Sequence, residues 1–338
     1  MAGDDTSGSI ASPNAERYPW HEALWETLSR QFERLPHALL LHGRPGLGKH
    51  AFAMQLTQTL LCAHPHTNGA CGRCHDCRLF VAGTHPDVSV IGLAEDAKII
   101  TIDQIRALGD FLSLRPHTAA RKVVIISPAE AMNLNAANAL LKLLEEPPLG
   151  SILVLVSSHP ARLPATVRSR CSRVFFKVPA RNEGLSWLRS HAAGGAGPEA
   201  LLELAGGSPL RAMAMAEAGF VENREQLLRD LNALQSGSED PVACAARWKS
   251  LGAGICLGWL YSFITDLIKL RIAGSVNDVI NLEAKSFVAD YKNKYGIMEL
   301  YNLVDVIGQY YRQLGGSLDE LLILEDILIR WARISRLQ

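Results

Sequence analysis

Short apolar runs and helical repeats alternate through the first half of the chain. Five runs are rich in branched residues and bounded by Gly, Pro or Ser, which is typical of buried strands. They are His37–His42, Asp87–Leu93, Lys122–Ser127, Ser151–Ser157 and Arg173–Val178. Apolar residues recur at helical spacing in the segments Lys49–Leu61, Thr101–Leu114 and Asn133–Glu145. This alternation predicts a five-stranded parallel sheet covered by helices on both faces.

The second half of the chain has a different pattern. After Pro179 no comparable apolar strand follows, and the residues read as helices separated by Gly-rich breaks. Breaks at 191–198 and 206–209 enclose a small helical segment, and a longer helical block begins near Asn223. The predicted domains are an α/β domain at 1–178, a small helical domain at 179–222 and a larger all-α domain at 223–338.

Length and composition agree with several domains and exclude some functions. A chain of 338 residues exceeds one ordinary domain of roughly 150 residues. Its 48% hydrophobic and 20% charged residues exclude wholesale disorder. Thirty-four Lys and Arg balance 34 Asp and Glu, so the chain lacks the basic excess that drives DNA binding through counterion release. Affinity for nucleic acid must come from a local patch or from partners.

Neither export nor a membrane span is expected. The segment Met1–Asn14 has no basic residue and no apolar core, unlike a secretion signal or a transit peptide. The most apolar stretch, Leu251–Thr265, is interrupted by three glycines and stops at Asp266, short of the roughly 20 residues that a span needs. We therefore predict a buried helix there. We expect a cytoplasmic protein without membrane contact, and an odd count of seven cysteines suits such a reduced compartment.

The segment from residue 37 to residue 50 reads HALLLHGRPGLGKH, a strand followed by a glycine-rich turn and a helix. This is the context of a phosphate-binding P-loop. Gly43, Gly46 and Gly48 let backbone N–H groups turn toward a phosphate, and Lys49 would reach the β and γ oxygens. The alternative is a plain Gly-rich turn with an exposed lysine.

Two features that hydrolysis needs are missing. His50 stands where a Ser or Thr hydroxyl normally binds magnesium, and imidazole is a poor ligand for that hard cation. The strand ending at Ser127 continues Ser-Pro-Ala, with no acidic pair to hold magnesium and orient water. Glu130 is expected to open the following helix; a catalytic base is the less favoured alternative. Nucleotide binding without turnover stays open, whereas hydrolysis in this chain is not expected.

Four cysteines within sixteen residues form the strongest chemical signal. Cys62, Cys71, Cys74 and Cys77 can close around one ion, and four thiolates are typical of structural zinc. An iron–sulfur cluster is the weaker alternative, because a ferredoxin run would continue with a cysteine at the position of Val81. Reduced thiols without metal are the third. The other cysteines are expected to be small buried hydrophobes: Cys171, Cys244 and Cys256.

Two arginines are candidates for contacts with nucleotide. Arg170 lies in a Ser-Arg-Cys segment within residues 162–177, which carry four Arg, one Lys and no acidic residue. Presented on a loop, its guanidinium could reach the γ-phosphate of a neighbouring subunit; a solvated basic loop is the alternative. Arg211, at the start of a helix in the small helical domain, could face a nucleotide, although alone it is an ordinary arginine at a helix start.

The order of these features resembles the AAA+ clamp-loader subunits of bacterial DNA polymerase III. The resemblance rests on Tyr18-Pro19-Trp20, the P-loop, the inserted cysteines, the ALLKLLEEPP segment at 139–148 and the Ser-Arg-Cys segment. Motifs cover about residues 18–222, and the rest is similar in length and helical texture only. Gamma or tau motor subunits of that family keep a full P-loop and an Asp-Glu at the strand tip. This chain resembles the branch of the family that has lost both.

The resemblance implies an architecture and an assembly. It implies a P-loop AAA+ module, a helical lid at 179–222 and a helical collar at 223–338 that joins a five-membered ring. Arg170 would act in trans as an arginine finger on ATP held by a gamma or tau motor subunit, and the four cysteines would hold zinc. The other partners implied are the delta subunit, the sliding clamp and primed DNA, as parts of a replication assembly.

Two alternatives come from other functional classes. A working AAA+ ATPase predicts that the purified chain hydrolyses ATP and loses this activity on Lys49→Ala. A zinc-dependent nucleic-acid-binding module predicts DNA affinity that disappears on chelation, but the neutral charge argues against it. In the collar, Val279–Leu282 and Leu321–Ile334 suit helices packed against neighbouring subunits, and packing within the domain explains them equally well.

Overall fold

The computed structural model describes residues 17–94, 97–191, 197–273, 296–314 and 318–334. The chain divides into two compact units that meet in sequence between Glu183 and Gly184, and each is described by itself. The boundary predicted near residue 222 stays a prediction. The segment Val279–Leu282 lies outside the described residues.

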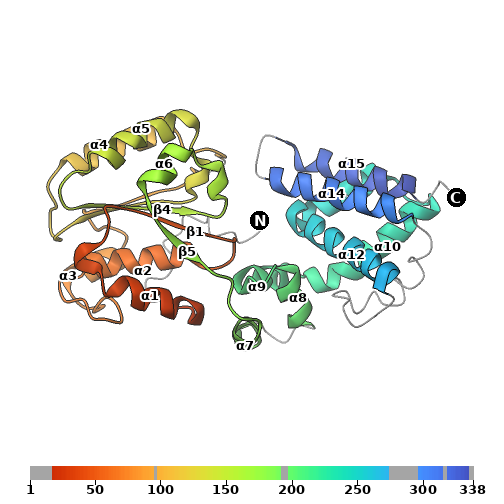
Figure 1. The fold of residues 1–338 in the computed structure, drawn as a ribbon, viewed down its shortest axis with the longest axis horizontal. Helices are drawn as coiled ribbons and strands as arrows, with labels where there is room; N and C mark the ends of the chain where they lie inside the picture. Colours follow the sequence, from red (N-terminus) through yellow and green to blue (C-terminus); the bar gives the residue numbers. More distant parts are fainter. Residues whose placement is uncertain (1–16, 95–96, 192–196, 274–295, 315–317, 335–338) are drawn as a thin grey trace. The chain divides into compact units, whose positions relative to one another are not determined.

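The first unit contains the predicted parallel sheet of five strands (Figure 1). Each strand pairs in parallel with its neighbours in the order β2-β3-β4-β1-β5. The bounds of β4 agree with the prediction, whereas the ends of the other four strands differ from it by one or two residues. The strands are β1 (Ala38–Gly43), β2 (Val88–Ile91), β3 (Lys122–Ile126), β4 (Ser151–Ser157) and β5 (Ser172–Phe176).

Helices cover both faces of this sheet, as predicted (Figure 1). Side chains alternate along each strand, so that Leu39 and Leu41 enter one core whereas Leu40 enters the other. Helices on the first face are α1 (Glu22–Ser29), α2 (Lys49–Leu61) and α3 (His75–Val81). Helices on the second face are α4 (Ile102–Ser113), α5 (Leu134–Glu145) and α6 (Ala165–Arg170).

Side-chain caps fix the starts of two helices on the second face. A capping box starts α4, with Gln104 Oε1 accepting from the Thr101 backbone N–H at 2.9 Å. Asn133 Oδ1 accepts from Ala136 N at 2.8 Å and starts α5. Helix α5 ends at Glu145, just before the two prolines that cannot continue it.

The second unit is helical throughout the part of it that the structure describes, as predicted. Helix α11 packs against α15, and α12 packs against α14. Apolar side chains of α15, including Ile327 and Trp331, are buried within the unit, which favours packing inside the domain for this helix. The helices are α7 (Arg181–His191, at the boundary), α8 (Pro198–Leu204), α9 (Pro209–Glu217), α10 (Phe220–Ser236), α11 (Pro241–Leu251), α12 (Ala253–Ala273), α14 (Ile297–Gln313) and α15 (Glu320–Ile334).

Helix α12 is the one helix, among the described residues, that is long and apolar enough to cross a membrane by length and composition. Inside the unit, 67% of its most apolar window is buried. The ring of Trp259 packs against Trp248, and Phe263 contacts Trp331. The helix also carries Asp266, which is fully buried. These contacts are typical of the core helix that was predicted around residues 251–265.

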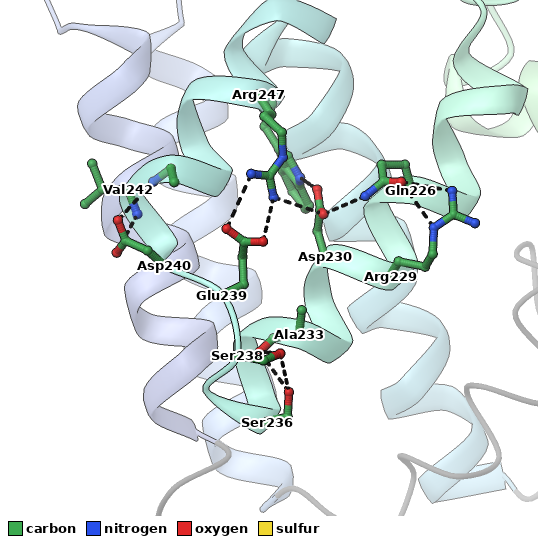
Figure 2. A network of polar contacts seen from close by, with 12 residues as sticks. Gln226, Arg229, Asp230, Ala233, Ser236, Ser238, Glu239, Asp240, Val242 and Arg247 are labelled. Atoms are coloured by element: carbon green, nitrogen blue, oxygen red, sulfur yellow. Dashed lines mark hydrogen bonds and ion pairs between the residues drawn. The ribbon is translucent and has the colours of Figure 1, made fainter.

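A buried carboxylate joins α10 to α11 (Figure 2). Asp230 is 3% exposed and accepts hydrogen bonds from Trp248 Nε1 at 3.0 Å, Arg247 Nη2 at 3.1 Å and Gln226 Nε2 at 2.9 Å. Arg247 also reaches Glu239 at 3.4 Å. Three donors on one carboxylate satisfy a charge that would be costly to bury alone.

Candidate functional site

The P-loop lies at the carboxyl end of the interior strand β1, between Gly43 and the first turn of α2. Strands β4 and β5 flank β1 on either side. Lys49, the first residue of α2, is fully buried, and its Nζ donates to the carbonyl oxygen of Arg44 at 2.7 Å. The ammonium group is therefore folded back onto the loop that would receive a phosphate.

Aromatic residues before α1 pack onto this loop. The rings of Tyr18 and Trp20 stack at 5.0 Å, and Trp20 Nε1 donates to the carbonyl oxygen of Leu47 at 3.0 Å. Buried His21 places Nε2 2.7 Å from the same carbonyl. Burial lowers the pKa of His21 to about 4, so the ring is neutral at physiological pH and donates from Nε2. The sequence offered this aromatic segment only as a family motif, and its contact with the loop was missed.

Two glycines of the loop are required by close approach. A Cβ on Gly43 would lie 2.6 Å from the carbonyl oxygen of Phe176 on β5. Gly48 has a φ of +77°, and a Cβ there would lie 2.5 Å from Tyr18 Cε2. Both positions therefore serve the packing of this unit as well as the shape of a phosphate-binding loop.

The magnesium-binding groups expected of a hydrolase are absent from the loop and from the tip of β3. His50 is buried as the second residue of α2, where a hydroxyl would stand. The residues after β3 are Ser127, Pro128 and Ala129, and none carries a carboxylate. The arrangement retains amide groups and one lysine for phosphate, but it has an imidazole in place of the hydroxyl and no carboxylate among residues 127–129.

Glu130 does not open helix α5, as was expected, but binds the backbone that follows β4. Glu130 lies in a single 3-10 turn before α5, and Asn133 caps that helix instead. Its Oε1 accepts from the backbone N–H groups of Ser158 at 2.9 Å and His159 at 3.0 Å. Burial opposes ionisation, but contacts with the His159 ring and these amides hold the pKa of Glu130 below its usual value. The carboxylate joins the tip of β3 to the tip of β4, a pairing that only the folded sheet reveals.

The four cysteines of the predicted metal site come together. Cys62 is the C-cap that follows α2, Cys74 caps the start of α3 and Cys77 lies inside α3. The four Sγ atoms lie within 4.8 Å of one another, with Cys62 to Cys74 at 3.8 Å and Cys71 to Cys77 at 4.0 Å. A tetrahedral ion with bonds of about 2.3 Å to sulfur needs sulfur–sulfur distances of about 3.8 Å. The four thiols therefore fit one metal ion.

The thiols of this cluster differ in acidity. Hydrogen bonds from the backbone of Arg73 and Cys74 lower the pKa of Cys71 to about 6, whereas burial raises the pKa of Cys62 and of Cys77. The remaining cysteines are buried, as predicted. Burial raises the pKa of Cys171 to about 11 and the pKa values of Cys244 and Cys256 to about 12, so these thiols are unreactive.

Arg170 lies at the end of a helix, and not on the loop that was predicted. Pro164 starts the short helix α6, which is too brief to show a helical repeat in the sequence, and Arg170 is its last residue. Its side chain is 37% exposed. Nη1 donates to the carbonyl oxygen of Thr166 at 3.0 Å, and Nη2 lies 2.6 Å from Glu145 Oε1. The guanidinium is thus held at the surface with donor capacity remaining.

Arg211 belongs to the helical unit. It lies in α9, and its guanidinium stands over the ring of Tyr311 of α14, 5.6 Å from the centroid. A contact between Arg211 and a nucleotide stays a prediction. The structure thus brings together the four cysteines and, separately, the loop of Gly43, Gly46, Gly48 and Lys49.

Comparison with known proteins gives a consistent result over both units. Residues 20–180 match the family described as DNA polymerase III, delta subunit, and residues 218–333 match DNA polymerase III, delta subunit, C terminal. The Pseudomonas aeruginosa protein named DNA polymerase III subunit delta-prime is 34% identical over 95% of this chain and 98% of its own length. This chain belongs to the delta-prime family. The Escherichia coli member is 32% identical over 93% of this chain and 94% of its own length.

Other similarities reach beyond the delta-prime family. The tau subunit of DNA polymerase III from Bacillus subtilis is 34% identical over 43% of this chain and 25% of its own length. A solved gamma subunit-related protein of Thermotoga maritima is 22% identical, covers 92% of this chain and 99% of its own, and superposes with a TM-score of 0.45. The predicted fold class, a P-loop AAA+ module followed by a helical C-terminal region, is confirmed by the strand order and the family matches.

Proposed function

We propose that this chain is the delta-prime subunit of a DNA polymerase III clamp loader, a member of the AAA+ ring that does not hydrolyse ATP. In the ring, Arg170 acts in trans on ATP held by a gamma or tau motor subunit. With the delta subunit as a further partner, the assembly places the sliding clamp on primed DNA in the cytoplasm. The relatives carry the subunit name, and the residues of this chain support the division of labour.

One contrast between two places in the α/β unit carries this proposal. Around the chain's own P-loop, His50 follows Lys49 where a hydroxyl would bind magnesium, and none of residues 127–129 after β3 carries a carboxylate. At the end of α6, by contrast, Arg170 presents an exposed guanidinium. Transfer of a phosphoryl group needs a positioned metal ion and a positively charged group beside the negative equatorial oxygens. This chain offers the second to a neighbour while lacking the first for itself.

We propose zinc as the ion of the four-cysteine site. The thiolate-only donor set and the tetrahedral spacing favour a closed structural site, and zinc bound there would crosslink α2 to α3. A closed site leaves no position for substrate, so the ion supplies stability and no chemistry. Lys49 and the loop amides are groups that can bind phosphate. The role proposed for Arg170 does not depend on whether ATP occupies this loop.

The test of the proposal is Arg170→Ala in an assembly reconstituted with motor and delta subunits. An arginine finger contributes about 1,000- to 100,000-fold in related NTPases, so hydrolysis at the adjacent site should fall by about that factor. Total DNA-stimulated ATP hydrolysis by the assembly should fall by at least the fraction that this one site contributes. Phosphate release is measured with saturating primed DNA and clamp.

Arg162→Ala is the matched control, because Arg162 is an exposed arginine of the same basic segment. It should leave hydrolysis near the wild-type rate. Unchanged hydrolysis with Arg170→Ala would remove the finger. Phosphate release by the purified chain alone that disappears with Lys49→Ala would instead establish the rival function, an active motor subunit.

A further inference from the structure

The last residue of α5 holds the last residue of α6. Glu145 Oε1 lies 2.6 Å from Arg170 Nη2, and the side chains are 51% and 37% exposed. The same guanidinium donates through Nη1 to the carbonyl oxygen of Thr166, the second residue of α6, at 3.0 Å. This carbonyl also accepts from Ser169 Oγ at 3.1 Å, so the arginine folds back along its own helix.

These two contacts hold the arginine without exhausting its donors. A guanidinium has five N–H donors in a fixed plane. One N–H of Nη1 and one of Nη2 account for the contacts with Thr166 and Glu145. Three donors remain for phosphate oxygens, so the arginine can keep both contacts while it binds a ligand.

Holding the side chain matters because a long arginine at the surface samples many rotamers. Each rotamer that points elsewhere reduces the fraction of molecules ready to contact a phosphate. An ion pair fixed to a neighbouring helix removes these rotamers before the ligand arrives, which lowers the entropy lost in the transition state. Glu145 is well placed for this, because it lies on α5, a different helix that packs against α6.

We infer that Glu145 is a positioning residue for Arg170. Its carboxylate fixes the guanidinium at the end of α6, in the orientation that a neighbouring subunit's ATP meets. This role rests on the proposed function of Arg170 as a finger. Glu145 touches no nucleotide in this account and acts only through the arginine.

The test is Glu145→Gln in the reconstituted assembly, with kcat and KM for ATP measured separately. Loss of an exposed ion pair should lower kcat by about two- to fivefold, with KM nearly unchanged, because the finger acts mainly in the transition state. Glu146→Gln is the matched control: Glu146 is the adjacent exposed glutamate and is outside the Arg170 contacts. It should leave both constants near wild type.

A double variant separates positioning from a general structural effect. In the Arg170→Ala background, Glu145→Gln should cause no further fall in kcat. A further fall of the same size would show that Glu145 acts independently of the arginine and would overturn the inference. If Arg170→Ala is impaired but Glu145→Gln keeps the wild-type kcat, the positioning role of Glu145 is overturned and the role of Arg170 is not. Full activity of Arg170→Ala would overturn both roles. Melting temperatures of the variants verify that each is folded.

Discussion

Asp87 shows how a single side chain can order a distant segment. Its carboxylate is fully buried beside the start of β2. Oδ1 accepts from His117 N at 2.7 Å, and Oδ2 accepts from Thr118 N at 2.8 Å and Ala119 N at 3.0 Å. These donors belong to the connection between α4 and β3, so one carboxylate determines the path by which the chain enters the sheet.

Asp87→Asn should therefore destabilise the α/β unit at neutral pH. An amide NH₂ group would face backbone N–H groups, and the loss should be about 1.5–3 kcal/mol, the range for hydrogen bonds to a charged group. Burial opposes ionisation, but the three amides outweigh it and lower the pKa of Asp87. The wild-type advantage should be complete above the unfolded-state pKa of about 3.9 and disappear as the pH falls through the lower native pKa. Urea unfolding at neutral and acid pH measures this.

Asp103→Asn on α4 is the control, because that carboxylate is 84% exposed. Its free energy of unfolding should stay within about 0.5 kcal/mol of wild type. A difference between Asp87→Asn and wild type that grows as the pH falls would contradict the account, since it would place the native pKa above the unfolded one.

Residue-level chemistry was predictable where it depended on spacing along the chain. The four cysteines, the loop glycines and Lys49 all come from short motifs. The partners of Glu130 and Arg170 were not predictable, because Ser158 and Glu145 meet them only after β4, α5 and α6 have packed. No local pattern records a contact between the ends of two helices.

At the scale of elements, the four-cysteine site joins the end of α2 to the start of α3. Cys62 is at the end of α2, and Cys74 and Cys77 belong to the start of α3. Asp76 on α3 also faces buried His85 at 3.4 Å, just ahead of β2. A bound ion would fix α3 from one side while this contact holds it from the other.

Removing the ion should lower the melting temperature of the α/β unit, and Cys74→Ser should abolish the response to chelator. Serine supplies a hydroxyl oxygen that can accept from Cys77 N, where the Cys74 sulfur now accepts, and it removes one thiolate ligand. Each kcal/mol lost should shift the melting temperature by about 2–4 °C in a unit of this size. Zinc content and thermal melts with and without chelator provide the measurement.

The wild-type chain should contain one zinc per molecule and melt at a lower temperature after chelation. Purified protein that carries no zinc, or a melting temperature that ignores the chelator, would argue for reduced thiols without metal. An absorbance band of iron–sulfur charge transfer would argue for the cluster instead.

Elements were predicted well where they were long or deeply buried. Strand β4, with buried residues throughout, was predicted to the residue, and α2 likewise. Helices α3 and α6 were not predicted, because seven and six residues are too few for a helical repeat to show. This affected the prediction for the site, because Arg170 was expected on a loop and lies at the end of helix α6.

At the scale of the whole chain, the two units have separate means of stabilisation. The α/β unit contains the cysteine cluster, whereas the helical unit contains the Asp230 network in Figure 2. The pattern of apolar residues along the sequence predicted that strands are replaced by helices near residue 179. It could not predict the carboxylate at the centre of the helical unit, whose donors lie four to eighteen residues away on two helices.

Asp230→Ala should destabilise the helical unit by about 3–5 kcal/mol, because Arg247 and the Trp248 indole lose their buried partner. Chelation should act on the other unit. Calorimetry of the full chain should therefore resolve two transitions, one moved by Asp230→Ala and one by chelator. Glu239→Gln, at the more exposed end of the network, should cost about 1 kcal/mol or less. A single transition that both treatments move would contradict separate units.

The packing of Tyr18 against Gly48 changes how experiments on this loop must be interpreted. In an active ATPase, replacing a loop glycine is a standard way to remove nucleotide binding. Here any side chain at position 48 would meet an aromatic ring as well as a left-handed backbone. Such a variant would report misfolding of the amino-terminal segment, and its loss of clamp loading would say nothing about ATP. Lys49 is also fully buried, and its Nζ donates to the Arg44 carbonyl oxygen, so Lys49→Ala must be checked for folding in the same way.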